Sequence, residues 1–293
     1  MEPSNKPIRA ALVGSSIQAS LTPAMHMAEG RRQGLDYRYD LVDLALLGGG
    51  AELLPGILAR AAGEKLVGLN ITHPCKQAVI AYLDQLSEDA AALGAVNTVV
   101  FKEGRRHGHN TDWWGFAEAF RLKLPGAGLG RVVQLGAGGA GAATAYAILR
   151  LGAGRLAIFD PDRARAELLV ETMRQCFPRA EILVGVDIRA EMEDASGLVH
   201  ATPTGMANYP GLPIDPDLLH RRHWVAEIVY FPLETELLAE ARRCGCRVTD
   251  GGGMAVLQAV GAYRLFTGRE ADAARMLQHF QTLTRPSPAE AAT

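Results

Sequence analysis

Residues 131–146 read Arg131-Val-Val-Gln-Leu-Gly136-Ala-Gly138-Gly139-Ala-Gly141-Ala-Ala-Thr-Ala-Tyr146. A short apolar strand is followed at once by glycines and then by an alanine-rich run of helical composition. This order is typical of a dinucleotide pyrophosphate site, where Gly136 permits the tight turn, Gly138 lets the phosphates approach and Gly141 lets the helix pack closely. The helix N-terminus offers N–H groups to the anion. The alternative is a plain structural turn, since glycines also mark ordinary loops.

The next strand candidate, Arg155–Phe159, favours the dinucleotide interpretation because it ends in Asp160. An acid at this distance beyond the first glycine is typically the one that holds the ribose of NAD. Strand patterns then recur through the region and alternate with helical stretches, as a doubly wound parallel sheet requires. The strands are expected at 181–187, 197–202, 224–230 and 247–249, and the helices at 163–176 and 235–243.

The first part of the chain has its own alternation of apolar strands and helical stretches, which predicts a separate α/β unit. Strands are expected at 8–13, 37–41, 66–71 and 96–101, helices at 24–33 and 51–62, and a loop at 102–109. Helices are also expected at 113–122, 254–266 and 271–284, followed by a frayed tail from Arg285.

The predicted fold is therefore α/β with two lobes. Residues 1–112 and 254–293 form a substrate-binding domain, to which the C-terminal helix returns, and residues 113–253 form a Rossmann-type domain with a doubly wound parallel sheet. We expect the chemistry in the cleft where the first lobe faces the carboxyl ends of the second lobe's strands.

Composition excludes several classes of function. The 293 residues are 48% hydrophobic and 21% charged, as in ordinary soluble proteins, and the net charge of −2 gives no reason to expect nucleic acid or an anionic membrane as partner. No apolar run is long enough to cross a bilayer, and the N-terminal residues lack the pattern of a secretory signal. We expect a cytoplasmic protein.

The cysteines and histidines do not form a recognisable ligand set. Cys244 and Cys246 flank a single glycine, which is not the spacing of common zinc or redox motifs, and Cys75 and Cys176 stand apart. We expect free thiols and no metal site.

Several polar residues near predicted strand ends can carry chemistry, but each also has an ordinary structural explanation. Lys76 can bind a substrate hydroxyl and pass its proton on, or it can be a solvated lysine. Asp112 can act with it or simply cap a helix. Asn97 can bond a substrate hydroxyl or cap a turn, and Ser20 to Pro23 can be a helix start with proline in its first turn.

Taken together, these stretches resemble the shikimate dehydrogenase family along nearly the whole chain. Eight motifs occur in the family's order: Ser20-Leu-Thr22-Pro23-Ala-Met-His26, Asn70-Ile-Thr72-His-Pro74-Cys-Lys76, Gly94-Ala-Val-Asn97-Thr98, Asn110-Thr-Asp112, Gly136-Ala-Gly-Gly-Ala-Gly141, Ala201-Thr202-Pro203-Thr-Gly205-Met206, Tyr230-Phe-Pro232-Leu-Glu-Thr235, and Asp250-Gly-Gly-Gly-Met254 with Gln258.

The resemblance implies hydride transfer between a nicotinamide cofactor and the ring hydroxyl of a cyclic polyol carboxylate. It assigns the family's lysine and aspartate dyad to Lys76 and Asp112. It assigns substrate binding to Ser20, Thr22, Thr72, Asn97, Tyr230 and Gln258, with Asp112 also among the ligands of the ring hydroxyls. It assigns cofactor binding to Gly136, Ala137, Gly138, Gly139, Ala140, Gly141, Asp160, Arg165, Thr202, Pro203 and Gly251. A polyol acid needs several such donors and acceptors, while the cofactor carries the redox step.

One departure from the family's pattern concerns the cofactor. Many members that use NADP carry Asn-Arg-Thr after the second nucleotide strand, where this chain has Asp160-Pro161-Asp162. Asp160 would accept from both ribose hydroxyls and repel a 2′-phosphate, so we expect NAD rather than NADP. Arg163 and Arg165 leave NADP open as the alternative.

Other departures concern the substrate. Ser20-Leu-Thr22 stands where shikimate-specific members usually have two serines, and the chain looks like the branch that oxidises quinate and shikimate with NAD. His200 replaces a common asparagine, and Gly252-Gly253 replaces larger residues, which either admits an amino-substituted ring or, as we favour, loosens a loop. Gly251 to Gly253 is also a candidate hinge. An aminoshikimate-type enzyme and a non-catalytic ligand-binding regulator remain alternatives, and the sequence leaves monomer and homodimer open.

Overall fold

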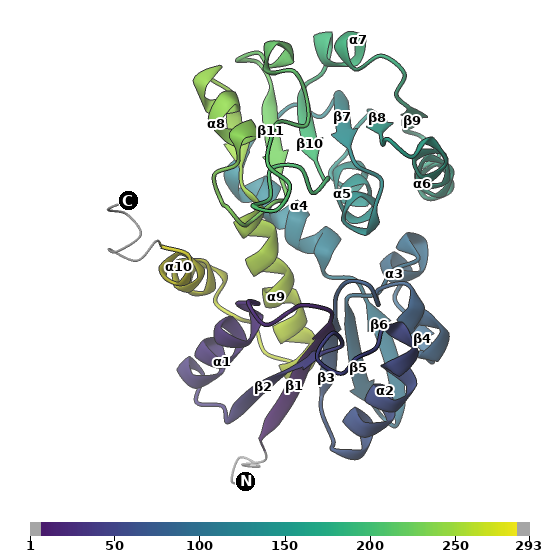
Figure 1. Ribbon diagram of the computed structural model, residues 1–293, viewed down its shortest axis with the longest axis vertical. Helices are drawn as coiled ribbons and strands as arrows, with labels where there is room; N and C mark the ends of the chain where they lie inside the picture. Colours follow the sequence, from purple (N-terminus) through teal and green to yellow (C-terminus); the bar gives the residue numbers. More distant parts are fainter. Residues whose placement is uncertain (1–6, 286–293) are drawn as a thin grey trace. The chain divides into compact units, whose positions relative to one another are not determined.

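Two six-stranded sheets organise residues 7–285, the part of the chain that this computed structural model describes (Figure 1). Each sheet belongs to one of two units, which are described here one at a time. Unit 1 comprises residues 7–111 and 256–285, and unit 2 comprises residues 112–255. The sequence placed these boundaries after residues 112 and 253. The part of the predicted tail that follows Arg285 lies outside the described residues.

Unit 1 contains a mixed sheet with the strand order β2-β1-β3-β5-β6-β4. Its strands are β1 (Ile8–Gly14), β2 (Tyr37–Asp43), β3 (Gly68–Ile71), β4 (Gln85–Leu86), β5 (Thr98–Lys102) and β6 (Arg105–His109). β1 pairs in parallel with β2 and β3, and β5 is antiparallel to both β3 and β6. The helices are α1 (Thr22–Arg32), α2 (Leu54–Gly63), α3 (Glu88–Leu93), α10 (Ala273–Leu283), the 3-10 helices η1 (Ala51–Leu53) and η2 (Ala78–Tyr82), and the part of α9 (Gly251–Thr267) that follows Ala255.

The core of unit 1 includes two buried clusters. One gathers Leu54 and Leu58 of α2 with strand residues such as Leu69. The other joins Tyr37 and Tyr39 of β2 to Tyr263 and Phe266 of α9. Gly68 gives the Phe266 ring room, since a Cβ there would come within 2.3 Å of it. The predicted return of the C-terminal helical segment to the first lobe is confirmed, because its aromatic side chains belong to that lobe's core.

One part of the predicted organisation of this unit was wrong. Residues 102–109 were expected to form a loop, but Arg105–His109 is strand β6, paired with β5 from Lys102↔Arg105 to Thr98↔His109. Glu103 and Gly104 both have positive φ, 53° and 76°, as a two-residue hairpin turn requires. The strand was not predicted because Arg105 and Arg106 are charged and do not match the apolar pattern of a buried strand.

Unit 2 contains a sheet in which all strands are parallel, with the order β12-β11-β10-β7-β8-β9. The strands are β7 (Arg131–Leu135), β8 (Arg155–Phe159), β9 (Glu181–Val184), β10 (Gly197–His200), β11 (Trp224–Glu227) and β12 (Arg247–Thr249). The helices are α4 (Asp112–Lys123), α5 (Gly139–Arg150), α6 (Arg163–Cys176), α7 (Ile188–Glu193), α8 (Glu236–Arg243), the 3-10 helix η3 (Pro216–Leu218) and the first turn of α9. The predicted Rossmann-type doubly wound sheet is confirmed, with its switch point between β7 and β10.

The carboxyl ends of these strands differ from the prediction. β9, β10 and β11 end two to three residues earlier than expected. Gly252 and Gly253 were expected to loosen a loop, and Gly251 to Gly253 to be a candidate hinge, yet these glycines are the first turn of α9. Asp250 accepts hydrogen bonds from the N–H groups of Gly252 and Gly253, which satisfies this helix start. The three glycines therefore form the N-terminus of a helix that Asp250 caps.

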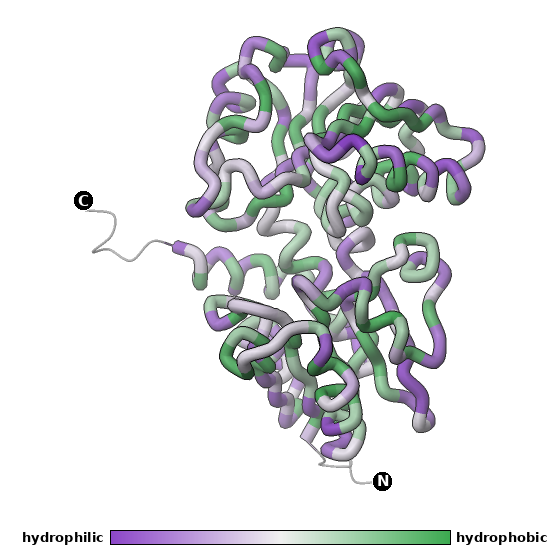
Figure 2. The backbone as a smooth tube through the Cα atoms, turned by 45° about the vertical axis from the view of Figure 1, so that its right-hand side comes forward, coloured by the Kyte–Doolittle hydropathy of each residue, from purple (hydrophilic) through white to green (hydrophobic). Residues whose placement is uncertain are grey.

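Hydrophobic and hydrophilic stretches alternate along the backbone of both units (Figure 2). None of the helices in residues 7–285 is long and apolar enough to cross a membrane.

Candidate functional site

The glycine turn of unit 2 is shaped by close backbone contacts. Gly136 has φ +98° and lies so near the end of β10 that a Cβ would sit 2.4 Å from the Ala201 carbonyl oxygen. A Cβ at Gly141 would lie 2.3 Å from the Gly136 carbonyl oxygen. The tight turn and the close packing of α5 that the sequence predicts at these two positions are therefore present, and no larger residue fits either place.

The start of α5 leaves space for a ligand. A Cβ built on Gly138 or Gly139 would meet nothing within 4 Å, so neither glycine is required by packing. Gly138 precedes the first helical residue and provides no side-chain cap for the helix N-terminus. Exposed N–H groups at the positive end of a helix dipole suit a phosphate, and the residues present therefore fit a dinucleotide pyrophosphate.

A polar cluster under the turn holds it in place. Gln134, fully buried in β7, donates from Nε2 to the carbonyl oxygens of Gly136 (2.9 Å) and Gly141 (2.8 Å). Its own Oε1 accepts from the Thr144 hydroxyl at 3.0 Å. The turn therefore keeps its shape through a buried side chain as well as through its glycines.

Asp160 lies at the end of β8, as the sequence predicts, and it contacts the glycine turn directly. Its Oδ2 accepts from the Ala137 N–H at 2.8 Å and its Oδ1 accepts from the Asp162 N–H at 2.9 Å. Arg165 approaches both carboxylates, at 3.8 Å from Asp160 and 3.5 Å from Asp162. Arg163 is paired with Glu167 at 2.8 Å. Both arginines that left NADP open are thus engaged with acids.

A second polar cluster lies at the carboxyl ends of β10 and β11. His200 is fully buried, its Nδ1 lies 2.9 Å from both carboxylate oxygens of Glu227, and its Nε2 lies 2.5 Å from Thr202 Oγ1. Glu227 also accepts from the N–H groups of Ile228 and Val229 and from the Thr235 hydroxyl. The Thr202 hydroxyl accepts from the Thr204 N–H at 3.3 Å.

In unit 1, the predicted substrate residues Ser20 and Thr72 lie on the loops after β1 and β3, and Thr22 is the first residue of α1. The two loops are joined, because Thr72 donates its N–H to Val13 and Ser15 donates its N–H to His73, both at 2.9 Å. The Ser20 hydroxyl accepts from the Thr22 N–H at 3.3 Å, and α1 begins at Thr22 with Pro23 in its first turn.

Asp43, at the end of β2, orders the loop that carries Ser20. Its carboxylate accepts from the Gln18 side chain and from the N–H groups of Ser16 and Ile17, at 2.9 to 3.1 Å. The Gln18 hydrogen bond first, and then the backbone bonds, lower the pKa of Asp43 below its usual value. The loop is therefore held by an ionised acid that the sequence analysis did not single out.

Asn97 lies in a buried hydrogen-bond network. Its Nδ2 donates to the Thr111 hydroxyl at 3.0 Å, and its Oδ1 accepts from the Thr111 N–H at 2.7 Å and from the Thr98 hydroxyl. The Asn70 side chain donates to the Asn97 carbonyl oxygen and to the Thr98 hydroxyl. These bonds give Asn97 a structural role in the unit, and its role toward substrate stays a prediction.

Lys76 belongs to the same region of unit 1. Its carbonyl oxygen accepts from the Val96 N–H at 2.8 Å, directly before Asn97, and its side chain is half-buried. Gln258 is half-buried on the part of α9 within unit 1. In unit 2, Asp112 is buried at the first residue of α4, and Tyr230 is 50% exposed after β11. Asp112 directly follows Thr111, the partner of Asn97.

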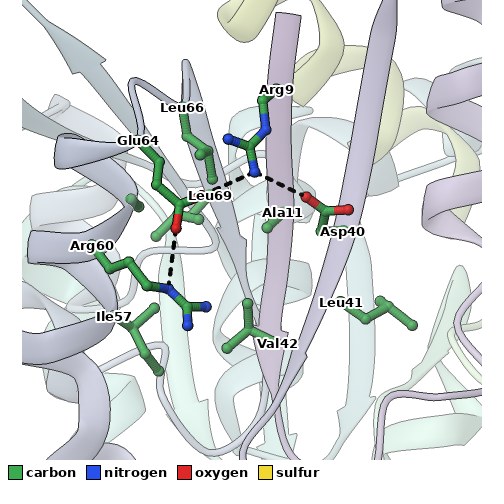
Figure 3. Close-up of a pocket in the computed structure, with 11 residues that line it drawn as sticks. Arg9, Ala11, Asp40, Leu41, Val42, Ile57, Arg60, Glu64, Leu66 and Leu69 are labelled. Atoms are coloured by element: carbon green, nitrogen blue, oxygen red, sulfur yellow. Dashed lines mark hydrogen bonds and ion pairs between the residues drawn. The ribbon is translucent and has the colours of Figure 1, made fainter.

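Two surface hollows lie in unit 1, and none of the predicted site residues lines them. The first, about 320 Å³, is rimmed by Arg9, Asp40, Arg60 and Glu64 (Figure 3). Arg9 pairs with Glu64 at 3.0 Å and with Asp40 at 3.6 Å, and Arg60 pairs with Glu64 at 3.7 Å. Such partly exposed pairs contribute little stability each.

The second hollow, of about 560 Å³, runs between α1 and α10. Arg275 there pairs with the buried Glu29 at 2.8 Å. Burial raises the pKa of Glu29, but hydrogen bonds led by the one from Arg275 outweigh it, so the net pKa is lowered. Residues 7–285 contain no group of three or more His, Cys, Asp or Glu side chains able to hold a metal ion, and all four cysteines are free.

Sequence reasoning missed four buried polar residues that shape these loops: Asp43, Gln134, His200 as a hydrogen-bonding group, and Glu227. The available signal was a polar residue inside an otherwise apolar strand, as in Val132-Val-Gln134-Leu135 and Trp224-Val-Ala-Glu227. Buried polar groups need partners, so such residues point to networks even before the partners are known.

Comparison with known proteins agrees with these features. A family model described as the shikimate dehydrogenase substrate binding domain matches residues 12–99. The chain is 56% identical to a shikimate dehydrogenase (NADP+) of Streptomyces avermitilis over 91% of this chain and 92% of that protein. It is 47% identical to a quinate/shikimate dehydrogenase (NAD+) of Corynebacterium efficiens, over 93% and 97%.

Among solved structures, quinate dehydrogenase from Corynebacterium glutamicum in complex with NAD superposes with a TM-score of 0.87 at 44% identity, covering 94% of this chain and 99% of that one. Its similarity extends over both units, as does that of the two sequence relatives. The chain therefore belongs to the shikimate dehydrogenase family of oxidoreductases, which act on alcohol groups with a pyridine nucleotide.

Proposed function

We propose that this protein is an NAD-dependent shikimate/quinate dehydrogenase that interconverts the ring 3-hydroxyl of shikimate or quinate with the corresponding ketone. The observation that carries the cofactor half of the proposal is the contact between Asp160 and the glycine turn. The substrate half is supported by the family's motifs in unit 1 and by relatives named for shikimate and quinate.

The choice of NAD follows from charge at the end of β8. Asp160 keeps an ionisable carboxylate where the ribose of the cofactor is expected, with only 7% of its side chain exposed. A 2′-phosphate at this position would meet that charge at short range. Arg165 is shared between two acids, and Arg163 pairs with Glu167, so a 2′-phosphate would have to compete with these ion pairs for either arginine.

We assign the proton to Lys76 and Asp112 and the orientation of the ring to the polar side chains of unit 1. A bound nicotinamide supplies the hydride acceptor. Lys76 and Asp112 hold the reacting hydroxyl and take up its proton as the ketone forms. Ser20 and Thr22 bind the substrate carboxylate with neutral hydroxyls, and Thr72, Asn97 and Gln258 bind ring hydroxyls. We also assign Tyr230 to substrate binding, as the family's motif implies.

The test is a panel of shikimate and quinate, each with NAD and NADP, followed by absorbance of the reduced cofactor. We expect oxidation of at least one ring acid, with kcat/KM at least about tenfold higher for NAD. A clear preference for NADP would contradict the cofactor assignment. If neither acid is oxidised while a ring analogue raises the melting temperature, the protein is a binder or acts on another ring.

A further inference from the structure

The carboxylate of Asp43 is surrounded by hydrogen-bond donors, most of them from the loop between β1 and α1. Its Oδ1 accepts from the N–H groups of Ser16 and Ala45, at 2.9 and 3.1 Å. Its Oδ2 accepts from the Ile17 N–H at 3.1 Å and from Gln18 Nε2 at 3.0 Å. A proton on either oxygen would oppose a backbone donor, so Asp43 is ionised although only 5% of its surface is exposed.

Two further contacts connect this acid to the hydroxyls assigned to the substrate carboxylate. The Ile17 carbonyl oxygen accepts from the Ser20 N–H at 2.9 Å, and the Ser20 hydroxyl accepts from the Thr22 N–H at 3.3 Å. Asp43 therefore fixes Ile17, and Ile17 fixes the backbone of Ser20. The N–H groups of Ser16 and Ile17 are already bound to Asp43, so they cannot serve the substrate carboxylate in place of these hydroxyls.

The segment around Asp43 also supports the loop that carries Thr72. The Leu44 N–H donates to the Gly14 carbonyl oxygen at 2.8 Å. Gly14 in turn packs against Thr72, whose methyl group would lie 2.3 Å from a Cβ at position 14. The loops after β1, β2 and β3 therefore support one another, and a change at Asp43 should reach Thr72 as well as Ser20.

The conformation of Ser16 indicates that the loop needs this support. Its φ of +57° lies in the left-handed region, which a residue with a Cβ adopts only at a cost in free energy. The hydrogen bond from the Ser16 N–H to Asp43 is charge-assisted and offsets that cost. Without the carboxylate, Ser16 would be free to relax, and the path of the chain toward Ser20 would change.

We propose that Asp43 is a positioning residue for substrate binding, which holds the loop of Ser20 in the shape that receives the substrate carboxylate. Asp43 acts through Ser20 and Thr22 and not by contact with the substrate. The inference rests on the proposed function, because it takes a ring carboxylate as the ligand of unit 1. None of the eight motifs that the chain shares with its family includes Asp43.

Asp43→Asn tests the proposal, since it keeps the shape of the side chain and removes one acceptor oxygen. Whichever way the amide is turned, its NH₂ group opposes a backbone N–H, that of Ser16 on one side or that of Ile17 on the other. For the ring acid that the wild type oxidises, KM should rise about ten- to hundredfold, the worth of a charge-assisted hydrogen bond, while kcat stays within about threefold. The Kd for NAD, measured by calorimetry without ring acid, should not change.

Asp40→Asn is the matched control. Asp40 lies on the same strand, but it is exposed and pairs with Arg9 at 3.6 Å, so this variant should keep the wild-type KM. A second readout asks whether Asp43 acts through Ser20. In a Ser20→Ala background, Asp43→Asn should raise KM by a smaller factor than in the wild type, because part of the binding that it disturbs is already absent. A general loss of structure would multiply the two penalties in full.

Amide hydrogen exchange examines the loop without any substrate. In Asp43→Asn the amides of Ser16, Ile17 and Ser20 should exchange faster, while those of β1 stay protected. The proposal is overturned if exchange or KM stays at the wild-type value, or if the KM penalty is undiminished in the Ser20→Ala background. Failure of the proposed function would instead appear in the wild type, as no turnover of shikimate or quinate with either cofactor.

Discussion

Units 1 and 2 each place loops at the ends of parallel strands, but the loops are held by different chemistry. In unit 1 side chains do this work, with Asp43 binding the loop after β1 and Asn97 binding Thr111. In unit 2 the glycine turn packs backbone against backbone, at Gly136 against Ala201 and at Gly141 against Gly136, in addition to its side-chain bonds with Gln134 and Asp160. The difference suits the ligands proposed for each: hydroxyls need directed side chains, and phosphates need bare N–H groups.

The largest effect expected from this contrast concerns the chemical step, which we assign to side chains. Lys76→Ala should lower kcat by about 10²- to 10⁴-fold, the usual contribution of a positioned acid or base, and leave NAD binding to unit 2 intact. Steady-state turnover assays measure the loss of kcat, and calorimetry with NAD measures whether cofactor binding is unchanged. Lys102→Ala, at the end of β5, serves as the control lysine, and unchanged kcat in Lys76→Ala would remove Lys76 from the mechanism.

In unit 2 the largest losses of stability and of NAD binding should come from substitutions that disturb the backbone of the glycine turn. Gly136→Ala places a methyl group against the Ala201 carbonyl in a left-handed conformation, which we expect to cost about 2–5 kcal/mol of folding free energy and to abolish NAD binding. Gly138→Ala is the matched control, since its methyl group meets nothing within 4 Å. It should keep the melting temperature and lose cofactor affinity. Full affinity in Gly138→Ala would show that the phosphates do not approach there.

Buried histidines extend the comparison to pH. His26 in unit 1 is fully buried beside Tyr37 and Tyr39, and its Nε2 has no hydrogen-bond partner among the described residues. Burial lowers the pKa of His26 from 6.5 to about 3. Between these two pH values the imidazole is protonated in the unfolded chain and neutral in the folded unit. Stability from His26 is complete above pH 6.5 and is lost as the pH falls toward 3.

Between pH 6.5 and 5 this loss should reach about 2 kcal/mol, at about 1.4 kcal/mol for each pH unit. Calorimetric unfolding at pH 7 and pH 5 measures it. His26→Phe keeps a ring in the cluster and cannot titrate. The difference between its free energies of unfolding at pH 7 and pH 5 should therefore be about 2 kcal/mol smaller than in the wild type. Equal pH dependence in the two proteins would mean that His26 is not the group responsible.

The smallest effect should be on cofactor choice. Asp160→Asn keeps an oxygen for the Ala137 N–H and removes the negative charge, so the ratio of kcat/KM for NADP to that for NAD should rise by about tenfold. Paired kinetics with the two cofactors measure the ratio. Asp162→Asn, two residues further on at the helix cap, is the control. A ratio that moves equally in both variants would point to general electrostatics and not to the 2′ position.

Sequence reasoning recovered the fold where a pattern reports directly on burial. The strand and glycine pattern from Arg131 to Gly141 defined the nucleotide unit, and β8 and α6 were predicted at their observed bounds. It failed where tertiary pairing decides, as for the charged strand β6, and where a cap decides, as for Asp250 and the glycines after it. It also missed Glu227, because one of the partners of this buried acid, His200, lies 27 residues away on the neighbouring strand.

The division of unit 1 also bears on how the chain folds during synthesis. Unit 2 is one continuous segment and leaves the ribosome whole, whereas the core around Tyr37 and Tyr39 needs Tyr263 and Phe266, which are translated after it. Domains fold as they emerge, so unit 2 should reach its native state first. Until Tyr263 and Phe266 have been synthesised, the early strands of unit 1 keep part of their apolar face exposed. During this interval the chain should be most prone to aggregation and to binding by chaperones.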